Sequence, residues 1–160
     1  MNLKPAFLCI LCLCFFAAGC TRKGCTDPSS LTYDAKATLD DGSCVYSADQ
    51  VLGNFVARDT TYTYNQDGTL AQSVSQNGFV ISKISKDKLL LQNYNTCSEV
   101  YATASKTSMV ITGSKDGCFN GTNFICTIKD GGTVLVYAYN VNNFNPFGAD
   151  YVKGVATKQP

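Results

Sequence analysis

The segment Thr133-Val-Leu-Val-Tyr-Ala-Tyr139 is the part of the sequence that says most about the fold. Side chains alternate between the two faces of an extended strand, so one face carries a leucine and two tyrosines and the other carries two valines and an alanine. Both faces are apolar, which is typical of a central strand in a β-sheet. The glycine-rich turn Asp130-Gly131-Gly132 precedes the segment, as expected at the end of a hairpin.

Similar short segments rich in Thr, Tyr, Val and Ile follow one another from Val45 to the C-terminus, and helical patterns are nearly absent apart from one turn at 47–53. We expect strands at 54–58, 61–65, 69–75, 79–85, 88–93, 98–104, 108–112, 123–129, 133–139 and 150–156. Further turns are expected at Asp67-Gly68, Asn77-Gly78, Lys86-Asp87 and Asp116-Gly117. In 69–75 only one face is partly apolar, which predicts a half-exposed strand. Residues 46–160 are therefore predicted to form an all-β domain, an antiparallel meander closed as a barrel or packed as a two-sheet sandwich.

Composition excludes several classes of function. The chain has 160 residues with 13 Lys+Arg, 12 Asp+Glu, nine Cys, and no His or Trp. Without histidine there is no imidazole base and no His-ligated metal site. A formal charge of +1 without a basic stripe argues against a nucleic-acid partner. Neither Glu99 nor Asp150 has an evident acid-base partner in the sequence, so we expect a protein that is not an enzyme.

The first twenty residues have the features of a targeting segment. Lys4 is followed by an apolar stretch from Ala6 to Ala18, which is too short for an ordinary spanning helix. The end of this stretch, Phe16-Ala17-Ala18-Gly19-Cys20, resembles the lipobox of bacterial lipoproteins. The resemblance implies removal of residues 1–19 and acylation of Cys20; simple secretory cleavage is the alternative. A lipid anchor on Cys20, a tether at 20–24 and a cell-envelope location follow from it.

Thr21 directly follows the cysteine that the lipobox would acylate. In the lipoprotein family, a residue other than aspartate at this position resembles the form that is sorted to the outer membrane. The expected location is therefore the outer membrane, with the membrane as a partner through the anchor.

Residues 24–44 resemble a recurrent motif of bacterial envelope proteins. The matching parts are Gly24-Cys25-Thr26-Asp27-Pro28, Tyr33-Asp34, Ala37-Thr38 and Asp40-Asp41-Gly42-Ser43-Cys44. Ser30, Thr32 and Ala35 depart from the usual pattern. In an oxidising compartment, Cys25 and Cys44 are expected to form a disulfide that closes this polar, Asp-rich loop at 25–44.

The aspartates of this loop allow two interpretations. Asp27, Asp34, Asp40 and Asp41 supply the hard oxygen ligands that Ca²⁺ prefers, and the stretch distantly resembles thrombospondin type 3 calcium loops. The alternation of carboxylates that directs them toward one ion is missing, however. Aspartates before proline and glycine also form Asx turns without any ion. No other cofactor is indicated.

Three cysteines remain in the β domain. Cys118 and Cys126 flank an expected hairpin loop and are our first choice for a second disulfide, with a pairing of Cys97 to either one left open.

The start of the β domain also resembles a known family. Residues 51–60, VLGNFVARDT, are similar to the G-x-Y-x-V-x-D-T strand that opens small lipocalin-like envelope domains, and Ser108–Gly113 is similar to a later part of them. The resemblance implies a barrel that encloses a small apolar ligand. A barrel filled by its own side chains is the alternative.

The most suitable binding loop is 140–148, where Phe144 and Phe147 lie among asparagines. The sequence thus predicts a lipid-anchored envelope protein with a noncatalytic binding or structural role, whose partner is an envelope protein or a glycan. A lipocalin-like carrier of a small apolar ligand is the alternative.

Overall fold

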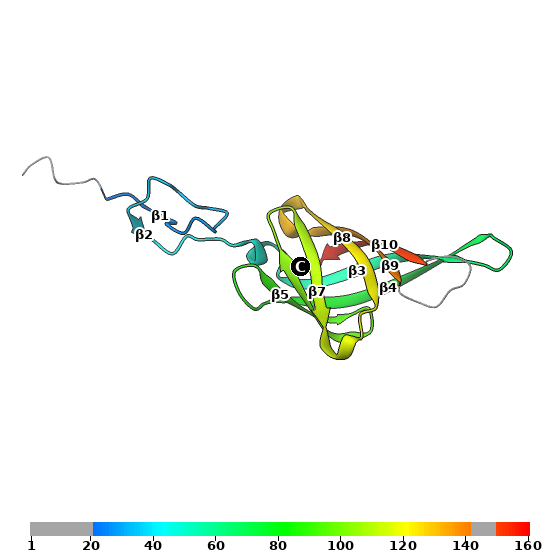
Figure 1. Cartoon of the computed structure of the whole chain (residues 1–160). Helices are drawn as coiled ribbons and strands as arrows, with labels where there is room; N and C mark the ends of the chain where they lie inside the picture. Colours follow the sequence, from blue (N-terminus) through cyan, green and yellow to red (C-terminus); the bar gives the residue numbers. More distant parts are fainter. Residues whose placement is uncertain (1–20, 142–149) are drawn as a thin grey trace, which may run out of the picture. The chain divides into compact units, whose positions relative to one another are not determined.

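A computed structural model describes residues 21–141 and 150–160 of the chain (Figure 1). They belong to two compact units, which divide between Cys44 and Val45. The signal segment 1–19, the expected lipid site Cys20 and the expected binding residues Phe144 and Phe147 lie outside the described residues. Within the described ranges, no helix is long and apolar enough to span a membrane.

The first unit contains the expected disulfide between Cys25 and Cys44, with an S–S distance of 2.05 Å. Two short strands, β1 (Lys23–Gly24) and β2 (Leu39–Asp40), pair in parallel beside it. Cys25 is the buried apolar side chain of this unit's described part. With so little apolar surface to bury, this unit depends on its disulfide, which contributes about 3 kcal/mol for a loop of this size.

Each of the four aspartates of the first unit caps a turn, and the turns of Asp40 and Asp41 overlap. Each carboxylate accepts a hydrogen bond of 2.9–3.0 Å from the backbone N–H two residues further on: Asp27 from Ser29, Asp34 from Lys36, Asp40 from Gly42, and Asp41 from Ser43. No group of three metal-ligating side chains lies close together in the described part of the chain. The contacts match the Asx-turn interpretation, and calcium binding by these carboxylates stays a prediction.

The second unit is a closed barrel of eight antiparallel strands. The strands are β3 (Gly53–Tyr64), β4 (Leu70–Lys83), β5 (Lys88–Tyr94), β6 (Cys97–Ala104), β7 (Ser108–Ser114), β8 (Gly121–Lys129), β9 (Val134–Val141) and β10 (Tyr151–Lys158). Each strand pairs with the next one in the sequence, and β10 also pairs with β3, which closes the barrel. The prediction of an all-β meander is confirmed, in its barrel form. Short 3₁₀ turns lie at Ser47–Val51, Lys115–Gly117 and Asp130–Gly132.

The hairpin of β3 and β4 corrects the expected strand boundaries. β3 joins two predicted strands into one, and β4 joins the next two. The pair Asn77-Gly78 is not a turn: the two residues lie opposite Ala57 and Val56 in an unbroken register. Neither has the positive φ that a tight hairpin turn requires, whereas Gly68 does, with φ 79°.

The outer half of this hairpin extends beyond the rest of the barrel (Figure 1). β4 pairs with β5 only from Val80 to Lys83, so among the described strands the preceding part of β4 pairs with β3 alone. Residues 70–76 are exposed on both faces, and the expectation of a half-exposed strand at 69–75 is therefore wrong. The reason is that no second layer of the described residues lies over either face of this projecting ribbon.

Side chains fill the middle of the barrel. The inward face of β9 carries Leu135, Tyr137 and Tyr139, all at most 4% exposed, as the alternation of residues 133–139 predicts. The two tyrosines belong to an aromatic cluster with ring centroids 5.1–6.2 Å apart; its other members are Phe55, Phe79, Tyr94, Phe119 and Phe124.

The second disulfide differs from the expected one. Cys97, at the start of β6, bonds to Cys118, and Cys126 is a buried free thiol. The prediction of Cys118 with Cys126 is wrong because Cys126 points into the barrel opposite Met109, while Cys118 lies in the connection that precedes β8. Burial raises the pKa of Cys126 to about 12, so this thiol is unreactive in the folded protein.

Candidate ligand-binding site

One end of the barrel holds a polar pocket of about 310 Å³. This end is formed by the outer half of the β3–β4 hairpin, the β5–β6 turn, the β7–β8 connection, and the ends of β9 and β10. The uncharged polar side chains that line the pocket are Thr61, Ser75, Asn77, Asn95, Thr96 and Asn120. Such amides and hydroxyls can both donate and accept hydrogen bonds.

Asp59 is the charged residue of this pocket. Phe55, Ala57 and Asp59 alternate on the inward face of β3, so the third of them lies above the apolar core and is only 7% exposed. The Tyr137 hydroxyl donates a hydrogen bond to its Oδ1 at 2.5 Å. The side chain of Asn77 also hydrogen-bonds to the carboxylate.

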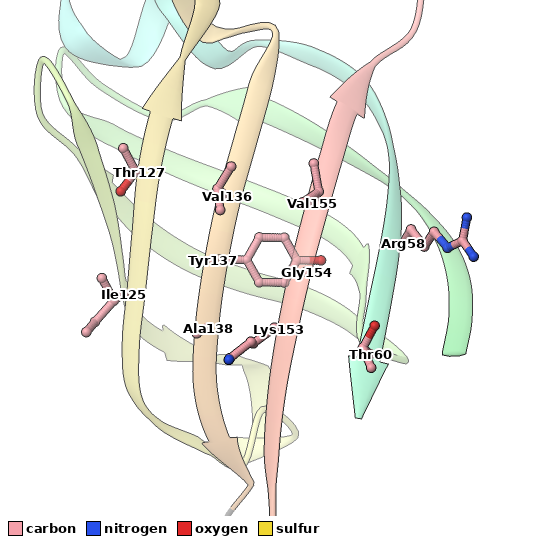
Figure 2. A pocket seen from close by; sticks show the side chains of 10 residues that line it. All are labelled: Arg58, Thr60, Ile125, Thr127, Val136, Tyr137, Ala138, Lys153, Gly154 and Val155. Atoms are coloured by element: carbon pink, nitrogen blue, oxygen red, sulfur yellow. The ribbon is translucent and has the colours of Figure 1, made fainter. Parts of the chain in front are cut away.

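Gly154 makes the contact between Asp59 and Tyr137 possible. It lies on β10 directly between them, opposite Asp59 on β3 and opposite Tyr137 on β9. A Cβ at this position would overlap both Asp59 Oδ1 and the Tyr137 ring. Figure 2 shows the Tyr137 ring crossing β10 at Gly154 toward β3. The missing side chain therefore leaves the space in which the phenol reaches the carboxylate.

Burial dominates the electrostatics of the pocket. It raises the pKa of Asp59, and the hydrogen bonds from Tyr137 and Asn77 oppose that shift only in part. No lysine or arginine lines the pocket in the described part of the chain. Burial, with Asp59 nearby, also raises the pKa of Tyr139 to about 12, so its phenol stays neutral.

Tyr94 lies deeper in the barrel. Its hydroxyl is buried and makes no hydrogen bond of normal geometry among the described residues, and burial raises its pKa well above the usual value. Neutral phenols thus lie at the end of the polar pocket that faces the core. Asp59 is the only carboxylate on the described lining of this pocket.

We expect Asp59→Asn to change stability in a pH-dependent way. The folded-state pKa of Asp59 is raised, so the folded protein favours the protonated carboxyl. The stabilisation from that protonated form is fully present below the ordinary pKa of about 3.9 and is lost as the pH rises through the folded-state pKa. The amide keeps an acceptor for Tyr137 and never ionises. The variant should match the wild type near pH 3 and exceed it at pH 8 by about 1 kcal/mol.

Urea unfolding of both proteins at each pH measures this difference, since the other carboxyls titrate equally in the two chains. Asp87→Asn, at an exposed aspartate outside the pocket lining, is the control. Its replacement should change stability by less than about 0.5 kcal/mol at either pH. A D59N protein that is less stable than wild type at pH 8 would show that the carboxylate stabilises the fold.

A second hollow, of about 600 Å³, lies on the outer face of the barrel over β8, β9, β10 and β3 (Figure 2). Ile125, Val136 and Val155 form its apolar part, and Arg58 and Lys153 stand beside them. Ile125 is 70% exposed, so this face is open to solvent. The described residues offer no acid-base pair here.

The structure brings few of the sequence-predicted site residues together. The aspartates of the first unit lie in Asx turns outside this pocket, and of the predicted cysteines only Cys118 is on its described lining. Asp59 was missed because the expected strand ended at Arg58. A continuous strand would have placed this carboxylate on the same face as Phe55 and Ala57, which is the signal of an unusual buried charge.

No family model matches the chain, and comparisons with curated proteins and with solved structures give no significant match.

Proposed function

We propose that this is a lipid-anchored cell-envelope protein with a noncatalytic role, whose barrel binds a small polar ligand in the pocket above Asp59. The observation that carries the proposal is a buried carboxylate, Asp59, with no basic side chain on the described lining, placed in a pocket of amides and hydroxyls. Burying such a group costs free energy unless its lone pairs are used. Tyr137 and Asn77 use some of them, and a ligand that donates hydrogen bonds would use the rest.

The ligand class follows from the chemistry of the lining. A pocket of about 310 Å³ is at the small end of ligand sites. Its carboxylate and amides suit a molecule with several N–H or O–H donors, namely an ammonium compound or a monosaccharide unit. The Tyr139 ring at the wall could contact either one, through cation–π attraction or stacking.

The anchor and the location rest on the N-terminal sequence. The lipobox resemblance at Phe16–Cys20 supports acylation of Cys20, and Thr21 supports sorting to the outer membrane. The noncatalytic role is supported by a single carboxylate in the described pocket lining and by a chain without histidine, because general acid-base chemistry usually employs a pair of titrating groups.

A lipocalin-like carrier of a small apolar ligand is the alternative. The closed up-and-down barrel favours it, since barrels of eight strands can hold one small ligand. The aromatic cluster in the middle of the barrel weighs against it, because those rings occupy the space in which an apolar molecule would lie.

Isothermal titration of the protein with three probes tests the proposal: putrescine, glucose and oleate. We expect heat from putrescine or glucose, and at least a tenfold loss of putrescine affinity in Asp59→Asn, since an ion pair and its hydrogen bonds are removed. Glucose binding should fall less, because the amide still accepts a hydrogen bond.

The matched control is Thr127→Ala, an exposed change in the outer hollow, which should leave all three titrations unaltered. Binding of oleate alone, unchanged by Asp59→Asn, would favour the apolar carrier. A flat trace with both polar probes would contradict the proposed pocket.

A further inference from the structure

The projecting part of β4 has an open strand edge. Between the turn at 65–69 and Val80, where pairing with β5 begins, no strand of the described chain pairs with the second edge of β4. Every residue from Leu70 to Gln76 is exposed, and Val74 is 58% exposed. The backbone groups along such an edge are a template for another strand.

This edge lacks the features that usually prevent strand addition. Proteins protect open edges with lysine, proline, inward-pointing charges or β-bulges. Residues 70–79, LAQSVSQNGF, contain no charged residue and no proline. The register with β3 runs without a shift from Tyr64 opposite Leu70 to Gly53 opposite Ile81, so no bulge bends the edge away.

The sequence of the edge is also self-complementary. Gln72-Ser73-Val74-Ser75-Gln76 reads the same in both directions. If two such strands run antiparallel about a two-fold axis at Val74, each valine faces a valine, each serine a serine and each glutamine a glutamine. Paired amides and paired hydroxyls can hydrogen-bond to each other across an antiparallel ladder.

We propose that two copies of this chain join through their β4 edges, antiparallel and with the two-fold axis at Val74. The contact is isologous, so it closes at a dimer. In this register Leu70 lies opposite the partner's Gly78, and the ladder ends on each side where the hairpin turn or β5 begins. The centre of the palindrome thus coincides with the middle of the open edge.

The residues around the open edge of β4 are compatible with a second copy of the chain as the partner. The nearest charged residues along β4 and its turn are Asp67 and Lys83, which both lie outside the paired span, so no like charges face each other within it. A two-fold axis perpendicular to the sheet keeps the inner face of both strands on the same side. Ser75, on that inner face, also lines the polar pocket, so the two pockets of the dimer open toward the same side.

Disulfide trapping of the full-length chain in its cells tests the register. Val74→Cys should give a covalent dimer on non-reducing gels, because opposed Cα atoms are about 4.5–5.5 Å apart, within disulfide range. Gln72→Cys alone should not, since the two cysteines would be about 13 Å apart along the strands. Gln72→Cys should crosslink when it is coexpressed with Gln76→Cys.

Val110→Cys is the matched control, at a similarly exposed valine on β7. Equal crosslinking of the Val74 and Val110 variants would overturn the proposal. Efficient crosslinking of Gln72→Cys alone would overturn the antiparallel register.

A charge at the two-fold axis tests the same contact without a covalent bond. Val74→Lys places two ammonium groups face to face, and sedimentation of the full chain in density-matched detergent should show dimerisation weakened by about tenfold or more. Val110→Lys should leave it unchanged, and circular dichroism should show the barrel intact in both. An unaltered sedimentation profile for Val74→Lys, or a monomeric wild type, would overturn the dimer.

Discussion

Gly154→Ala is expected to destabilise the barrel by about 3 kcal/mol and to weaken the proposed ligand binding in the pocket above Asp59. The added methyl group would occupy the space in which the Tyr137 ring meets the Asp59 carboxylate. One of the two side chains must then move, and the hydrogen bond between them breaks.

Neither side chain has an easy alternative position. The Tyr137 ring packs against Tyr94 and Phe124 at centroid distances of 6.0 Å, so it cannot move back without disturbing the aromatic cluster. The Asp59 carboxylate would remain buried but would accept fewer hydrogen bonds. Overpacking and the loss of a buried hydrogen bond each cost about 1–3 kcal/mol, which gives the magnitude.

Gly113→Ala is the matched control for this prediction. Gly113 also lies in a strand, but a Cβ there meets nothing within 4 Å. Its replacement should change stability by less than about 0.5 kcal/mol. Urea unfolding of both variants measures the difference. Combining Gly154→Ala with Asp59→Ala should recover part of the loss, because the smaller side chain frees the space; purely additive effects would contradict the steric explanation.

Much of the fold could be predicted because it depends on local patterns. The alternation in residues 133–139 identifies the inward face of β9, and Asp-Gly pairs at 67–68 and 116–117 mark real turns. Asn77-Gly78 has an equally strong turn signal but lies inside β4. Pairing with β3 over its whole length outweighs that local preference, and such tertiary pairing is not visible in one strand's sequence.

The candidate site was harder to predict because its parts come from distant strands. Asp59, Gly154 and Tyr137 are adjacent only because β10 lies between β3 and β9, and barrel closure sets that order. Gly154 inside the strand β10 is the one local signal, since glycine in a strand often marks a close approach. Cysteine pairing has the same limit: Cys118 is nearer in sequence to Cys126, yet the β5–β6 turn brings Cys97 to it.

The disulfide between Cys97 and Cys118 leads to the second large effect. We expect the double replacement Cys97→Ser/Cys118→Ser to lower barrel stability by about 3 kcal/mol, the chain-entropy value for a closed loop of this length. Replacing both cysteines avoids a new free thiol. The β7–β8 connection should also become the most mobile part of the barrel.

That local effect follows from the pairing of β7 and β8. The two strands share only the pairs Ser108–Thr127 and Met109–Cys126. From Val110 to Ile125, the two arms of the β7–β8 hairpin are therefore not paired with each other. The disulfide fixes this connection to the start of β6, and Phe119, one residue beyond Cys118, packs against Tyr94 and Tyr139. Since Cys118 and Asn120 line the polar pocket, its affinity for the polar probes should fall as well.

The matched control is Cys25→Ser/Cys44→Ser, which opens the disulfide of the other unit and should leave the barrel's unfolding midpoint unchanged. Amide hydrogen exchange gives the local readout: protection should decrease between Val110 and Ile125 in the barrel variant and remain in β9 and β10. Peptide mapping of the wild type under non-reducing conditions should find Cys97 linked to Cys118 and Cys126 unmodified by thiol reagents. A barrel variant as stable as the wild type, or a peptide linking Cys118 to Cys126, would contradict this role of the disulfide.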